Sequence, residues 1–144
     1  MKPRNLEEVR KEVEELRDSQ GEPIDPKIKD LVIGLRRWGI KTVRSCEGHS
    51  EGDYSKEGLP YPYPWVEIDK ADIMDIIRIL QHWWQGKDRN IPSTGQPRWI
   101  IKAYAGVIKI IPEDKKSRTL KEMQEDAVAF GKFLQTLPDD YFTQ

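Results

Sequence analysis

The stretch IKTVRSCEGH, residues 40–49, separates two parts of the chain that carry regular apolar patterns. Its first half is rich in β-branched residues, which favour extended backbone, so we predict a strand over residues 40–45. Gly39 ends a helical pattern before this strand, and Gly48 after it allows a tight turn with a positive φ angle. A strand that runs into a turn brings its last side chains to the edge of a sheet, a common place for ligand sites. The stretch therefore predicts a small scaffold that presents one polar loop.

Two helices are predicted before this stretch. The first covers residues 5–18, with Asn5 as its N-cap and an apolar stripe at helical spacing. The second opens at Asp25-Pro26, with the aspartate as cap and the proline at the first helical position. Its apolar residues recur with the period of a buried helix face, namely Ile28, Leu31, Val32 and Leu35. Arg36 and Arg37 follow, where positive charge suits the helix dipole and where an anion could alternatively bind.

Strands and helices alternate again after the stretch. Residues 65–68 are predicted to form a strand, and residues 98–104 and 107–111 form a hairpin that turns at Ala105-Gly106. The helix between them, which Asp69 can cap, is predicted to expose His82 on one face and to bury the opposite stripe of Ile73, Ile76, Ile77, Leu80 and Trp84.

The last helix begins at a capping box formed by Thr119 and Glu122 and stops at Pro138. The tail, residues 139–144, is predicted to fray. The order α-α-β-β-α-β-β-α therefore predicts an α+β fold with a mixed or antiparallel sheet of about four strands covered by helices.

The composition limits the classes of protein that fit. A chain of 144 residues suits one domain, residues 1–144, that can bury a core. The net charge of −1 gives no overall attraction to nucleic-acid phosphates. One cysteine cannot form an internal disulfide, which favours a reducing, cytoplasmic location. The chain shows neither a secretory signal nor an apolar run of membrane-spanning length, so no membrane partner is expected.

A loop over residues 50–64 is long for a compact domain and is predicted to be a mobile lid. Its aromatic residues alternate with prolines, and Trp65 follows directly. We assign Tyr61, Tyr63 and Trp65 to ligand binding as one wall of a pocket, although the same residues could pin the loop to the core. A separate hypothesis is that these aromatics are exposed and bind a protein partner.

Residues 44–49 offer three kinds of chemistry. Cys46 is a candidate nucleophile, with His49 as its base and Glu47 as a residue that orients His49 or acts as a general base. Cys46 and His49 also form half of a zinc-type ligand set, which His82, Glu51 or Asp53 would have to complete.

The third chemistry is binding of an anion or a polar small molecule. Ser45, Arg44, His49 and the turn amides around Gly48 could together hold a phosphate or carboxylate. We predict that the protein binds a small polar or anionic ligand at Ser45 to His49, and a chemical transformation of that ligand is a second hypothesis. The alternative to any chemical role is that Cys46 is an ordinary buried cysteine at a strand end, beside a turn glycine.

Residues 21–49 resemble part of the wyosine-modifying tRNA methyltransferase family, and also small uncharacterised proteins with a Ser-Cys-x-Gly-His motif. The resemblance rests on the segment from Gly21 to Asp25, the helix after it, and a signature in which Ser45, Cys46 and Gly48 match. Glu47 and His49 stand where the methyltransferase family has serine and arginine. The resemblance implies S-adenosylmethionine as cofactor and a modified guanosine in tRNA as substrate. Any RNA contact is expected to be local, through Arg36, Arg37, Lys41 and Arg44.

Overall fold

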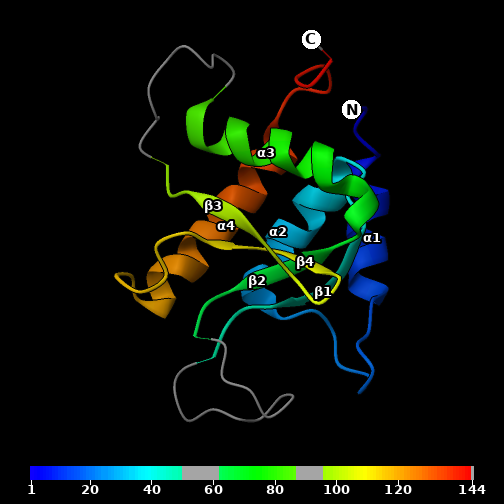
Figure 1. Cartoon of the computed structure of the whole chain (residues 1–144). Helices are drawn as coiled ribbons and strands as arrows, with labels where there is room; N and C mark the ends of the chain where they lie inside the picture. Colours follow the sequence, from blue (N-terminus) through cyan, green and yellow to red (C-terminus); the bar gives the residue numbers. More distant parts are fainter. Residues whose placement is uncertain (50–61, 87–95, 144) are drawn as a thin grey trace.

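A computed structural model describes residues 1–49, 62–86 and 96–143 (Figure 1). The described residues form four α-helices, a short 3-10 helix and a four-stranded sheet, and confirm the predicted α+β class and element order. In chain order the elements are α1 (Leu6–Glu15), α2 (Pro26–Arg37), β1 (Thr42–Cys46), β2 (Trp65–Ile68), η1 (Lys70–Asp72), α3 (Ile73–Gln85), β3 (Trp99–Tyr104), β4 (Val107–Pro112) and α4 (Leu120–Thr136). None of the helices in these ranges combines the length and apolar character needed to cross a membrane.

The sheet is antiparallel throughout and has the strand order β1-β2-β4-β3. The β3–β4 hairpin turns at Ala105 and Gly106, whose φ angles are 48° and 77°. Two positive φ angles match the twist of the flanking strands, as in the tightest hairpin turns. Strand β1 occupies an edge of the sheet, and its pairing with β2 shifts register between Thr42 and Arg44.

Local hydrogen bonds fix the N-terminal starts of two helices, as predicted. The Asn5 side chain accepts from the Glu8 N–H at the start of α1, and Thr119 and Glu122 form a complete capping box at the start of α4. Helix α1 ends at Glu15, three residues before the predicted end at residue 18.

Helices α2 and α4 lie side by side behind the sheet and form the most extensive contact between elements (Figure 1). Their backbones approach closely at Gly34 and Gly131, where an added Cβ atom would have no room. A Cβ atom added at Gly131 would lie 2.3 Å from the Asp30 carbonyl carbon and 2.4 Å from Leu31 N. Helices α1 and α3 and one face of the sheet complete the same core, through residues such as Val9, Ile79 and Val66.

Helix α3 is rotated relative to the predicted stripe. Its buried residues are Ile76, Ile79, His82 and Trp83, whereas Ile77 is 36% exposed. The prediction that His82 is exposed was therefore wrong. The His82 ring contacts Phe142, and its Nδ1 lies 3.2 Å from the Tyr141 hydroxyl, which gives a buried imidazole a hydrogen-bond partner.

The C-terminal tail packs on the core. Phe142 is 1% exposed and meets the Trp38 ring edge to face, with 4.7 Å between the ring centroids. The prediction that the tail frays was wrong for Tyr141 and Phe142, because their rings complete an aromatic cluster with His82. The predicted lid, residues 50–64, lies outside the described residues except for its last three positions, and so do Tyr61, Glu51 and Asp53.

Candidate functional site

A cleft of about 330 Å³ lies between the α1–α2 connection and the edge strand β1. Residues Leu16 to Asp25 provide most of one wall, with the exception of Gly21, and Thr42 to Cys46 provide the other. Because β1 pairs with a neighbour on one side only, the α1–α2 connection can lie along its free side. His49 and Trp65 also line the cleft, so the polar loop after β1 opens onto it.

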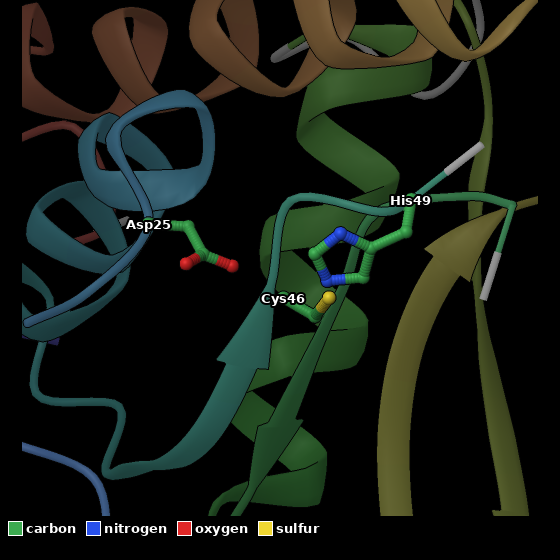
Figure 2. Close-up of side chains that lie close together, drawn as sticks. All are labelled: Asp25, Cys46 and His49. Atoms are coloured by element: carbon green, nitrogen blue, oxygen red, sulfur yellow. The ribbon is translucent and has the colours of Figure 1, made fainter. Parts of the chain in front are cut away.

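Three chemically reactive side chains meet at this cleft. A carboxylate oxygen of Asp25, the Cys46 sulfur and a ring nitrogen of His49 all lie within 4.8 Å of one another. Figure 2 shows the Asp25 carboxylate and the His49 ring both directed toward the Cys46 sulfur. Asp25 immediately precedes α2, Cys46 ends β1, and His49 follows in the loop. The third member is therefore Asp25, and not His82, which lies in the aromatic cluster beside the C-terminal tail.

Backbone amides of the loop hold two of these side chains. The Glu47 N–H donates to Asp25 Oδ2 over 3.2 Å, and the Gly48 N–H donates to the Cys46 sulfur over 3.3 Å. Both amides thus stabilise negative charge on the atom that accepts from them. Helix α4 in turn holds the loop, because Gln124 Nε2 donates to the Glu47 carbonyl oxygen over 3.0 Å.

The carboxylate of Glu47, and not that of Asp25, accepts a hydrogen bond at the start of α2. Within the described residues, the Asp25 side chain does not cap α2 but binds the loop. The Glu47 carboxylate instead accepts from Lys27 N–H in the first turn of α2, over 3.4 Å. A carboxylate at a helix N-terminus is electrostatically favourable, so Glu47 positions the loop. This contact gives no support to its predicted role of orienting His49.

Gly48 adopts the positive φ angle that the sequence predicted, at +88°. A Cβ atom there would lie 2.6 Å from Leu120 Cδ1 and 2.8 Å from the Tyr63 carbonyl carbon. The loop thus needs glycine for two reasons: its backbone conformation, and its close approach to the chain before β2.

Gly48→Ala is expected to lower the free energy of unfolding by about 2 kcal/mol, because strain at positive φ and overpacking act together. Gly39→Ala is the matched control: its φ angle is +83°, but nothing lies within 4 Å of an added Cβ. We expect it to cost about 1 kcal/mol. Urea unfolding of both variants makes the comparison, and equal costs would show that the close approach at Gly48 contributes nothing.

The arginines predicted to bind anions are engaged within the protein. Arg44 pairs with Glu67 at 2.8 Å across the β1–β2 ladder. Arg36 donates to Thr42 and pairs with Glu12 at 3.2 Å. Burial of the Arg36 guanidinium lowers its pKa, and the Glu12 carboxylate opposes this effect.

Arg37 does not belong to a surface patch. Its side chain is 7% exposed, donates to the Leu134 carbonyl oxygen and pairs with Asp139. Its burial does not fit a place in the predicted RNA contact of Arg36, Arg37, Lys41 and Arg44, and that contact stays a prediction. The contacts of Arg37 with Leu134 and Asp139 hold the end of α2 against the end of α4.

The predicted aromatic wall divides between two places. Trp65 lines the cleft but is 4% exposed, and Lys109 Nζ lies 3.7 Å from the centroid of its ring. Tyr63 instead borders a second hollow of about 310 Å³, together with Trp65, Lys102, Tyr104, Lys109 and Ile111. Trp65 is too buried to act as an exposed anchor for a protein partner.

Ser45 lies opposite Val66 in the sheet, is half-buried and lines the cleft. From the residues alone, Asp25 was predicted to cap α2, and no role was predicted for Gln124. Asp25 does stand within the segment that carries the family resemblance, which was the one available signal for it. Gln124 lies in α4, where the regular apolar stripe already accounted for the sequence pattern. No feature of the neighbouring sequence therefore marked Gln124 as part of the site.

Comparisons with models of known protein families, with curated proteins and with solved structures found no match. The resemblance of residues 21–49 therefore stays a prediction. The function has to be inferred from the chemistry of the cleft.

Proposed function

We propose that the protein binds a small polar ligand in the cleft, with Asp25, Cys46 and His49 around the reactive part of that ligand. The observation that supports this proposal most is the meeting of a carboxylate, a thiol and an imidazole at one cleft. Small-molecule sites are typically concave, begin at about 300 Å³ and carry a few convergent polar groups. The cleft satisfies each of these conditions.

The lining favours a ligand with polar groups of both signs over a purely anionic one. Asp18, Glu22 and Asp25 bring carboxylates to the cleft, and Arg17, Arg36 and Arg44 bring guanidinium groups. Since Arg36 and Arg44 already pair with Glu12 and Glu67, they offer less charge to an anion than the sequence suggested. Leu16, Ile24 and Val43 add apolar surface against which a carbon skeleton can pack.

A panel of small molecules tests the proposal through the ligand-induced rise in melting temperature. The panel contains amino acids, carboxylates, phosphates and S-adenosylmethionine, and tRNA is tested in a parallel binding assay. We expect a zwitterionic or hydroxylated metabolite to bind, and Asp25→Asn or Ser45→Ala to weaken its affinity by about 10-fold or more, as loss of a hydrogen bond to a charged group does.

Lys102→Ala is the control, because Lys102 borders the second hollow and does not line the cleft. Its affinity for the ligand should match that of the unmodified protein. Binding that Lys102→Ala abolishes and Asp25→Asn leaves intact would place the ligand elsewhere and contradict the proposal. Binding of both S-adenosylmethionine and tRNA would support the methyltransferase-like alternative instead.

A further inference from the structure

We infer that Asp25, Cys46 and His49 are three ligands of one divalent transition-metal ion of the zinc type, with a fourth position that faces the cleft. The inference rests on the proposed function, because the cleft ligand would occupy that fourth position. A carboxylate oxygen, a thiolate sulfur and an imidazole nitrogen are the three donor types that zinc takes in proteins.

The spacing of the donor atoms fits a shared ion. Zinc–ligand distances of about 2.0 to 2.3 Å place the ligands of a tetrahedral site roughly 3 to 4 Å apart. Here all three donor atoms already lie within 4.8 Å of one another. The three donor atoms are therefore already close to the separations that a shared ion requires.

The loop also supplies the surroundings that metal ligands usually have. The Gly48 N–H donates to the Cys46 sulfur, and the Glu47 N–H donates to Asp25 Oδ2. Such hydrogen bonds orient ligands and offset the negative charge that they carry. Because Gln124 and the first turn of α2 hold Glu47 in place, both amides are fixed by the fold.

The same geometry argues against Cys46 as a free nucleophile. In a cysteine–histidine–carboxylate triad the carboxylate orients the imidazole, and the imidazole activates the thiol. Here the Asp25 carboxylate also lies within 4.8 Å of the sulfur itself. A thiolate at Cys46 would be repelled by this carboxylate, and because Cys46 is only 7% exposed, water would screen the two charges poorly. A divalent cation between them converts this repulsion into attraction.

Three protein ligands with one open position are typical of zinc sites that bind substrates, whereas structural sites use four. The fourth position would take a group with a lone pair on the cleft ligand. We therefore assign the ligand to molecules that carry a carboxylate, phosphate, thiolate or imidazole able to coordinate zinc. Ser45 and Trp65 line the same cleft and would contact the rest of the molecule.

Zinc and cobalt titrations of chelator-treated protein test the inference. We expect near-stoichiometric zinc by elemental analysis of protein purified without added metal. Cobalt should produce the near-ultraviolet charge-transfer absorption of a thiolate–cobalt bond. Cys46→Ser should abolish that absorption. Asp25→Asn and His49→Gln should each weaken zinc binding by at least about 100-fold, because loss of a residue that only hydrogen-bonds to a metal ligand costs up to about 100-fold.

Glu125→Gln is the matched control, because Glu125 is exposed on α4, does not line the cleft and lies outside the three-residue group. Its zinc affinity should be unchanged. Absence of zinc and of the cobalt–thiolate absorption in the unmodified protein would overturn the inference without reference to any variant. Unchanged zinc affinity in folded Asp25→Asn would overturn the three-ligand assignment.

The ligand panel, run on chelated and on zinc-loaded protein, separates the inference from the proposed function. A cleft ligand that binds equally well with and without added zinc, in protein that takes up no zinc, overturns the metal site alone. Zinc binding with no cleft ligand overturns the proposed function and leaves the metal site standing.

Discussion

Gly131→Ala is expected to lower the free energy of unfolding by about 3 kcal/mol, as overpacking of a close-packed interior does. The added methyl group would lie 2.3 Å from the Asp30 carbonyl carbon and 2.4 Å from Leu31 N. Both are backbone atoms inside α2 and cannot rotate away, so the two helices have to separate. Alanine is otherwise the better helix former by about 1 kcal/mol, so a loss of stability reports the helix contact and not helix propensity.

Chemical denaturation of the unmodified protein and the variant measures this effect. Lys132→Ala is the control on the neighbouring, exposed position of α4, and should change stability by less than about 0.5 kcal/mol. In Gly34→Ala, the added Cβ atom would lie 2.8 Å from the Gly131 carbonyl oxygen. This approach is less close, so we expect Gly34→Ala to destabilise the protein less than Gly131→Ala does. A neutral or stabilising Gly131→Ala would mean that α2 and α4 do not touch there. Because Asp25 directly precedes α2 and α4 holds Glu47, we also expect weaker binding of zinc at the proposed metal site in the Gly131→Ala variant.

Phe142→Ala is expected to lower the free energy of unfolding by about 3 kcal/mol, the usual cost of truncating a buried phenylalanine. The ring is 1% exposed and meets the rings of Trp38, Tyr141 and His82. Truncation leaves a cavity between α2, α3 and the tail. It also exposes the buried His82 ring to water.

Thr143→Ala tests the neighbouring exposed residue and should change stability by less than about 0.5 kcal/mol. Thermal and urea unfolding of the two variants, compared under one set of conditions, provide the measurement. Equal, small effects for both would show that the tail is loosely attached and that the original prediction of fraying describes it better. A large effect for Phe142→Ala alone shows that the last residues belong to the core.

The polar loop shows how far prediction of the site could go. The loop holds Cys46, Gly48 and His49 close together in sequence. These residue types were enough to mark the loop as a candidate site and to predict a positive φ angle at Gly48. Asp25 could not be selected in this way, because its role depends on a contact across the cleft. Its position before Pro26 was sufficiently explained by a role as the cap of α2. Only the fold shows that the Glu47 carboxylate accepts the hydrogen bond at the start of α2, and that the Asp25 carboxylate accepts from Glu47 N–H instead.

Features that depend on a few neighbouring residues were determined by the sequence itself. The caps at Asn5 and Thr119 and the hairpin turn at Ala105-Gly106 arise from hydrogen bonds and φ angles within one turn, where residue identity acts directly. The strand order, the rotation of α3 and the burial of His82 were decided by the tertiary structure. Each depends on which apolar faces meet, and such contacts join residues that are distant in the chain and compete for the same core volume. The same rule holds for the site: the sequence supplies Cys46 and His49, and the packing of α2 beside β1 adds Asp25.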